Sequence, residues 1–385
     1  MTVAVSRREV RAAAAGVAVT FGLNGVAVAT WFARVPAARD ALGLTAGALG
    51  LLLLSMSLGA FLAMLSAGEV THRLGARRTV CVSALVVSSG LAVAGVGIGA
   101  FPSVVLTAVG IFVLGYGSGL CDVAMNVEAA EVERALGRTV MPRFHAMWSL
   151  GTVAAAGLAS LVAWALLPVT AHLAGVAAVV AVGTLLAART YGLGGDAEHG
   201  HSGVLKAWRE PRTLLIGVLV LVLAFTEGTA NDWVAVAFID GHAFDAAAGS
   251  VVFGVFVTTM TFGRIVGTIA LDRWGRVPVL LVTMVVAACG VALAVFGGSP
   301  LVAVAGVAVW GLGTALGFPV GMSAAADDPA HAAARVSVVA VIGYTAFLAG
   351  PPLVGLLGDQ VGVLKALLVV PLLLIPALAL VPVLR

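Results

Sequence analysis

Long apolar stretches, separated by short polar ones, follow one another along this chain. A helix that crosses the hydrocarbon core of a membrane needs about 20 mostly apolar residues at ~1.5 Å each. Cutting the chain at its polar and Pro/Gly-rich clusters predicts twelve such helices. Their approximate extents are 13–35, 45–67, 79–100, 103–128, 144–167, 170–189, 213–238, 247–271, 278–297, 300–324, 334–356 and 363–384.

The composition requires lipid as the surrounding solvent. Of the 385 residues, 61% are hydrophobic and 10% are charged, and the mean hydropathy is +1.12. Soluble domains carry about 25% charged residues, so this chain has too few charges to cover a water-exposed surface. We therefore expect an all-α membrane protein. The first apolar stretch exceeds a signal-peptide core of about 7–15 residues and is interpreted as an uncleaved span. A cleaved signal is the alternative, because Ala27–Ala29 is cleavage-like.

The distribution of basic residues predicts the orientation. If the N-terminus is inside, only Arg34, Arg39 and Lys365 of the 21 Lys and Arg lie outside, and Arg264 lies within a span. Loops on the cytoplasmic side carry the excess of Lys and Arg, so both termini are expected in the cytoplasm.

No enzyme, metal or cofactor signature accompanies the spans. The three cysteines are isolated in apolar segments, so neither a disulfide framework nor a metal site follows from them. The chain has no Gly-x-Ser-x-Gly, no His-Glu-x-x-His and no Gly-x-x-x-x-Gly-Lys motif. We therefore expect no cofactor, no nucleic-acid partner and no enzymatic activity. A membrane enzyme or a non-transporting receptor stays open as a different class of function.

The two halves of the chain repeat at an offset near 200 residues. This predicts bundles at 1–190 and 213–385, joined by a cytoplasmic linker at 191–212. The matching segments are THRLGARR (71–78) with LDRWGRVP (271–278), GYGSGL (115–120) with GLGTAL (311–316), and NGVAVATW (24–31) with EGTANDW (227–233).

With these loops, twelve spans and a central linker, the chain resembles the major facilitator superfamily over essentially its whole length, in a bacterial, sugar-porter-like branch. The resemblance implies two six-helix bundles related by pseudo-two-fold symmetry, a bacterial inner-membrane location, a monomer and alternating access to a central site. It also implies a gating role for the basic loops. His72 and Ala76 depart from the loop pattern in the first copy, whereas Asp272 retains the acidic position in the second. The loop residues to which the resemblance gives a gating role are Arg73, Arg77, Asp272, Arg273 and Arg276.

Ionisable side chains inside spans are costly and usually mark a pathway. Asp122 and Asn126 are four residues apart and therefore share one helical face. Arg264 and His145 lie near the same predicted inner side. In the resembled fold spans five and eight meet and span four lines the cavity, so the resemblance implies that His145 faces Asp122 and Arg264 at the inner mouth of the cavity. The alternative is that His145 only begins the fifth span.

Glu227 lies about 21 Å into the seventh span, and no basic residue has an evident position beside it. Burial disfavours the charged carboxylate, which suits a group that takes up and releases a proton. A structural hydrogen bond to a neighbouring helix is the alternative. Spans one and seven meet on the outer side in the resembled fold, so Arg34 and Asp232 are expected to pair there and to latch the outer gate, with ordinary surface pairing as the rival.

The remaining cavity candidates are amide and aromatic side chains. Aromatic rings offer flat apolar faces to sugars and ring-bearing solutes, although packing or lipid contact is the alternative for each. They are Asn24, Trp31, Asn126, Asn231, Trp233, Trp310, Phe318 and Tyr344.

The sequence therefore predicts a secondary transporter for a small organic solute, with membrane lipid and protons as further partners. Proton-coupled symport is the first hypothesis, and Glu227, Asp122 and His145 are the candidates for coupling. A proton-coupled exporter of amphipathic compounds is the second. Val113 stands where exporters of the resembled family carry arginine, and span five lacks their Gly-Pro kink.

Overall fold

The structure is a computed structural model that describes residues 6–137, 140–192, 204–328 and 331–385. Every regular element in these residues is helical. Twelve helical segments are long and apolar enough to cross a membrane. This confirms the predicted all-α membrane protein with twelve spans.

The first six spans run from the N-terminus to residue 190. They comprise α1 (Arg7–Phe32), α2 (Val35–Leu42), α3 (Ala46–Leu74), α4 (Ala76–Gly95), the π-helical turn η1 (Val96–Ala100), α5 (Val104–Leu136), α6 (Met141–Trp164), α7 (Val169–Ala187) and η2 (Ala188–Thr190).

The other six spans follow a short helix. These elements are α8 (Val204–Ala207), α9 (Pro211–His242), α10 (Ala246–Trp274), α11 (Arg276–Phe296), α12 (Pro300–Thr314), α13 (Gly317–Ala325), α14 (Ala332–Val361), α15 (Val363–Ala366), α16 (Val369–Ala377) and η3 (Leu378–Leu384).

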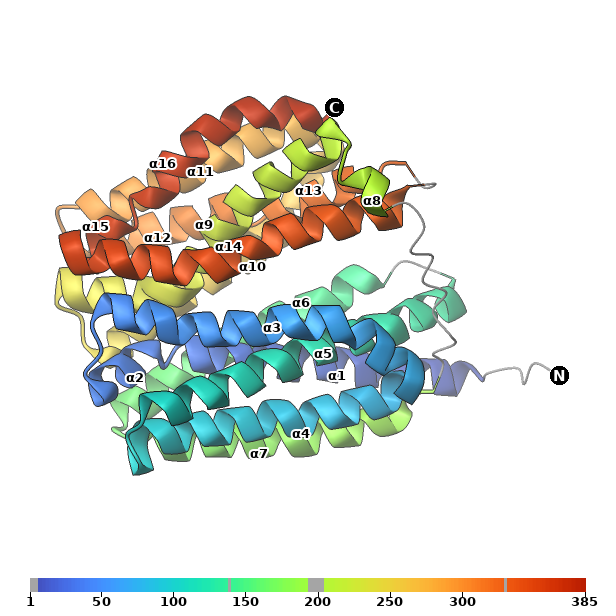
Figure 1. Ribbon diagram of the computed structural model, residues 1–385, viewed down its shortest axis with the longest axis horizontal. Helices are drawn as coiled ribbons and strands as arrows, with labels where there is room; N and C mark the ends of the chain where they lie inside the picture. Colours follow the sequence, from blue (N-terminus) through green and yellow to red (C-terminus); the bar gives the residue numbers. More distant parts are fainter. Residues whose placement is uncertain (1–5, 138–139, 193–203, 329–330) are drawn as a thin grey trace. The chain divides into compact units, whose positions relative to one another are not determined.

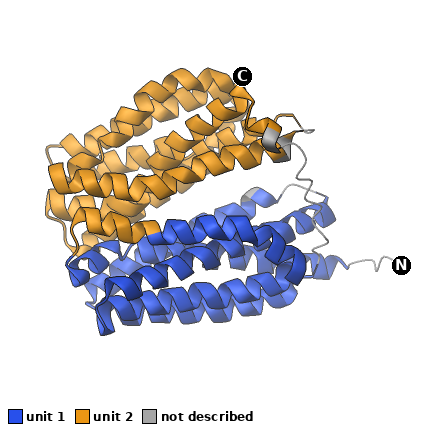
Figure 2. Ribbon diagram, in the orientation of Figure 1, with its two compact units in different colours: residues 1–43, 55–198 blue, residues 44–54, 199–385 orange. Residues whose placement is uncertain are grey.

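The chain divides into two compact units (Figure 2). Unit 1 holds residues 1–43 and 55–198, and unit 2 holds 44–54 and 199–385. The start of α3 groups with unit 2, where the Asp359 carboxylate accepts the Gly47 N–H at 3.0 Å and the Thr45 hydroxyl at 3.2 Å. The predicted boundaries at 190 and 213 place residues 44–54 in the first bundle instead. Half of the predicted linker, 193–203, lies outside the described residues.

Three helix contacts of unit 1 have counterparts in unit 2. In unit 1, α4 packs against α5 and α7, and α1 packs against α6 (Figure 1). In unit 2, α11 packs against α12 and α16, and α9 packs against α14 (Figure 1). These are corresponding spans of the two halves. The sequence repeat is therefore also a repeat of helix packing inside each unit.

Two pairs of glycines make this repeat visible at atomic level. A Cβ built on Gly90 of α4 would lie 2.4 Å from the Leu114 nitrogen of α5. A Cβ on Gly290 of α11 would lie 2.3 Å from the Trp310 nitrogen of α12. Small residues at such points let the helix backbones approach closely. The two matching loops repeat as well, since Gly75 and Gly275 have φ of +77° and +78° immediately before α4 and α11.

Candidate functional site

An ion pair within unit 2 connects α9 to α10. The Arg264 Nη2 donates to both oxygens of Glu227, at 3.0 and 3.2 Å. The side chains are 27% and 15% exposed, so the pair is neither sealed in the bundle nor fully open. The expectation that Glu227 has no basic partner is therefore wrong. A long arginine side chain on the neighbouring helix reaches it.

A break in the tenth span holds the same arginine. The Arg264 Nε donates to the Ala315 carbonyl at 3.4 Å, where α12 has ended and α13 has not begun. In a continuous helix this carbonyl would accept from the residue four positions later, which is Pro319. Proline has no N–H, so the carbonyl is left for another donor. The local sequence thus creates the acceptor that orients Arg264.

Aromatic rings adjoin this pair. The Phe318 ring meets Tyr344 edge-on at 6.1 Å, and Tyr344 lies 5.8 Å from Phe347. All three side chains are half-buried. A Cβ on Gly228, next to Glu227, would come within 3.0 Å of the Phe347 ring. Phe318 and Tyr344 were predicted from the sequence. Phe347 was not, although it lies three residues from Tyr344 on the same helix.

The other aromatic and amide candidates differ in exposure. Trp31, Trp233 and Trp310 are fully buried, and Trp310 packs against Phe256 with ring centroids 5.6 Å apart. Asn24 is also buried. Asn231 is half-buried, one turn from Glu227 on α9. Contact between these side chains and a solute stays a prediction.

In unit 1, Asp122 and Asn126 share a helical face as expected. The Asn126 Nδ2 donates to the Asp122 side chain at 3.2 Å and to its carbonyl at 2.8 Å. His145 is exposed, with its ring edge-on to Phe21 at 5.1 Å. Arg264 belongs to the other unit, so its predicted grouping with Asp122 and His145 stays a prediction.

Glu128 makes a buried hydrogen bond within unit 1. Its carboxylate is 1% exposed and accepts the Gly192 N–H at 2.9 Å. This bond ties the second residue after η2 to α5, near the start of the predicted linker.

Arg34 has a partner that the sequence did not suggest. Its Nε donates to His172 Nδ1 at 3.0 Å, and both side chains are buried in unit 1. Asp232 is buried in unit 2. The predicted Arg34–Asp232 pair would join the two units and stays a prediction.

The two basic loops make different contacts. In the first, Arg73 pairs with Glu69 one turn earlier, and Arg77 is exposed. In the second, Asp272 is exposed and Arg273 lies over the Trp274 ring at 5.5 Å. Gating by these residues stays a prediction.

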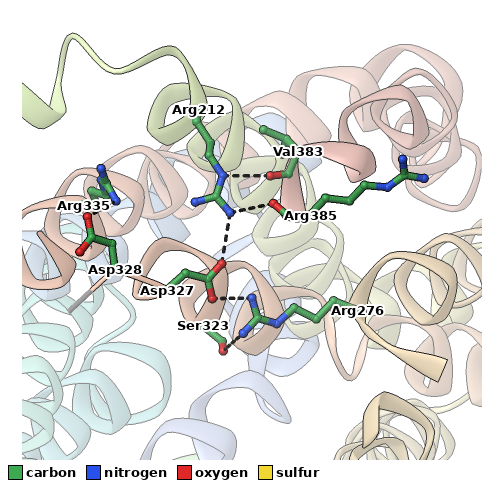
Figure 3. Close-up of polar contacts among 8 residues, drawn as sticks. All are labelled: Arg212, Arg276, Ser323, Asp327, Asp328, Arg335, Val383 and Arg385. Atoms are coloured by element: carbon green, nitrogen blue, oxygen red, sulfur yellow. Dashed lines mark hydrogen bonds and ion pairs between the residues drawn. The ribbon is translucent and has the colours of Figure 1, made fainter. Parts of the chain in front are cut away.

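Arg276 makes the acid–base contact of the second loop (Figure 3). Its Nη1 lies 2.6 Å from Asp327, which also pairs with Arg212 at 3.1 Å. These two guanidinium groups hold the pKa of Asp327 below its usual value, although burial opposes them. Arg212 further donates to the carbonyls of Val383 and Arg385. The first loop has Ala76 at the matching position and makes no equivalent pair there.

A second acidic cluster joins the start of α9 to α14. The Glu210 carboxylate accepts from Arg335 at 2.7 Å and from the Thr213 hydroxyl at 2.9 Å. The hydrogen bond from Arg335 lowers the pKa of Glu210. These bonds and those of Arg276 connect the neighbouring ends of α9, α11, α13 and α14 within unit 2.

Comparison with known proteins places the chain among membrane transporters. The family model of the Major Facilitator Superfamily matches residues 12–327. A relative from Yersinia pestis, named an uncharacterized MFS-type transporter, is 32% identical over 349 residues, covering 88% of this chain and 87% of the relative.

Solved structures agree with the fold. A mutant of the nucleoside transporter NupG has a TM-score of 0.81 at 14% identity, covering 96% of this chain and 99% of that one. The fucose:proton symporter FucP of E. coli has a TM-score of 0.66 at 14% identity, covering 96% and 98%.

Proposed function

The chain belongs to the major facilitator superfamily of transporters, and we propose that it moves a small organic solute across the membrane by proton-coupled symport. The observation that carries the proposal is the partly exposed Glu227–Arg264 pair, held between α9, α10 and the break in the tenth span. Ionisable groups inside membrane spans usually line a pathway. This pair offers a carboxylate for a proton and a guanidinium for a polar solute.

The coupling between proton and solute follows from the charge of Glu227. While Glu227 is ionised, Arg264 donates to both of its oxygens. A proton on Glu227 removes the negative charge and frees the guanidinium to donate to hydroxyl, carbonyl or anionic groups of a solute. Phe318, Tyr344 and Phe347 then offer apolar ring faces to the same solute. Proton binding thereby favours solute binding, and by linkage solute binding favours the proton.

The names of structural neighbours support transport of a small organic solute coupled to protons. They include a nucleoside transporter, a fucose:proton symporter and a D-xylose–proton symporter. Proton-coupled export of an amphipathic compound is the second candidate, favoured by the half-buried aromatic cluster. We further propose a bacterial inner-membrane monomer, and the basic-residue distribution supports a cytoplasmic location for both of its termini.

Reconstituted vesicles carrying a pH-sensitive dye test the proposal. A panel of nucleosides, sugars and organic acids is added outside at equal pH on both sides. Symport predicts that one class of solute acidifies the lumen, whereas proton–solute antiport makes the lumen more alkaline. If no solute changes the internal pH and none exchanges across the membrane, the transporter proposal fails.

The Glu227→Gln variant tests the carrier of the proton. We expect it to keep solute-for-solute exchange and to lose solute-driven proton flux, because exchange does not require net proton movement. Glu9→Gln is the matched control, since Glu9 is exposed and Gln preserves the capping box that it forms with Ser6. Proton flux that survives in Glu227→Gln moves the coupling role to another group, with Asp122 and His145 as the next candidates.

A further inference from the structure

Arg34 is a buried positive charge without an acidic partner in the described residues. Its side chain lies where α1 gives way to α2 and is 4% exposed. Its Nε donates to His172 Nδ1, but its Nη2 is buried with no acceptor. Arginine stays protonated in proteins, so the charge cannot be removed by losing a proton. Buried charges are normally paired, and this one contacts only an imidazole.

The hydrogen bond from Arg34 fixes the tautomer of the His172 imidazole. A guanidinium N–H can only donate, so Nδ1 of the imidazole must accept and the ring proton is assigned to Nε2. His172 is 6% exposed, and its Nε2 is also buried without an acceptor. The pair therefore carries one positive charge, and two of its donor nitrogens, Arg34 Nη2 and His172 Nε2, have no acceptor.

A helix end adds to the positive potential. His172 lies in the first turn of α7, and no side chain caps this helix, which is preceded by Pro168. The N-terminal end of a helix carries a partial positive charge and orphan N–H groups. A guanidinium beside such an end is disfavoured unless a negative charge is also present. The arrangement therefore favours a bound negative charge.

We propose that Arg34, positioned by its hydrogen bond to His172, binds through Nη2 one small monovalent anion, which is either a halide such as chloride or the carboxylate of an organic solute. The site lies inside unit 1 and is independent of the proton-coupling proposal for Glu227 in unit 2. The rival source of negative charge is Asp232, the partner predicted for Arg34 from the sequence.

Anion-dependent stability of the full chain tests the site. The unfolding temperature of purified protein is followed as sodium chloride replaces sodium gluconate at constant ionic strength. We expect a saturable rise of about 2–5 °C in the wild type, because a ligand that binds only the native state stabilises it. We expect Arg34→Gln to abolish the rise and His172→Gln to weaken it. Lys365→Gln, which changes an exposed lysine, is the matched control and keeps the full response.

Two series of salts distinguish the sources of the anion. Saturation by chloride, bromide and nitrate alone identifies an inorganic ion. Saturation by formate and acetate at lower concentration identifies a carboxylate, and such a site contacts the transported solute. A linear rise that is equal in all salts, or no rise at all, overturns the proposal. If Asp232→Asn destabilises the protein as much as Arg34→Gln, and the double variant adds nothing, Asp232 is the counter-charge instead.

A spectroscopic measurement on the wild-type protein tests the site without relying on variants that could fail to fold. Trp31 lies near the end of α1, three residues before Arg34. It is fully buried, so a quencher in solution does not easily collide with it. Iodide held at the site is expected to quench part of the wild-type tryptophan fluorescence at low, saturating concentration, and chloride is expected to reverse this. Strictly linear quenching that chloride does not affect contradicts the proposal.

Discussion

Arg264 donates through one nitrogen to Glu227 and through another to the Ala315 carbonyl, so it links three helical segments at a partly buried position. At the scale of single residues, removing one partner leaves the other with an uncompensated charge. We expect Arg264→Gln to destabilise the protein by about 1–3 kcal/mol, less than for a fully buried pair because both side chains are partly exposed.

A double-mutant cycle separates the pair from its surroundings. Combining Arg264→Gln with Glu227→Gln is expected to cost about 1–2 kcal/mol less than the sum of the single variants, measured by denaturation in detergent. The control combines Glu227→Gln with Arg273→Gln, because Arg273 lies on the same helix against Trp274. Those two changes are expected to add. Additivity of the Arg264 cycle would falsify a direct interaction.

At the scale of elements, the break between α12 and α13 has a definite chemical origin in Pro319. In Pro319→Ala the restored N–H competes for the Ala315 carbonyl that Arg264 now uses. We expect solute exchange in vesicles to slow several-fold, while the unfolding temperature stays the same or rises. Pro300→Ala is the control, since Pro300 begins α12 and donates to no helical bond. Equal exchange rates for both variants would show that the break has no role in transport.

Helix contacts of the repeat are equally testable. Gly90→Ala and Gly290→Ala would each drive a Cβ into the backbone of the adjacent helix. We expect each to destabilise the protein by about 1–3 kcal/mol, as overpacking does. Gly175→Ala is the control, because no atom lies within 4 Å of its added Cβ. In the helix interior that change is neutral or stabilising by about 0.5–1 kcal/mol. Tolerance at Gly90 alone or Gly290 alone would mean that the repeat no longer constrains both units equally.

At the scale of the whole molecule, the sequence predicted the spans but few of their contacts. Twelve spans were predictable because lipid imposes a minimum apolar length on each helix. The Glu227–Arg264 pair was not, since counting residues from helix ends estimates depth but neither rotation nor side-chain reach. The Arg34–His172 bond was missed for a related reason. His172 was visible as a polar residue at the start of a span, but a single sequence does not tell which helix faces it.

Orientation is the property of the whole molecule that the charge pattern predicts most directly. We expect Lys365 to face the cell exterior and Arg209 the cytoplasm, because cytoplasmic loops carry the excess of basic residues. Both side chains are exposed. The three native cysteines are first replaced, and Lys365→Cys or Arg209→Cys is then introduced singly. A membrane-impermeant maleimide is expected to label Lys365→Cys in intact cells and Arg209→Cys only after permeabilisation. The opposite pattern would reverse the assignment of inner and outer ends, and with it the side from which the Glu227–Arg264 pair takes its proton.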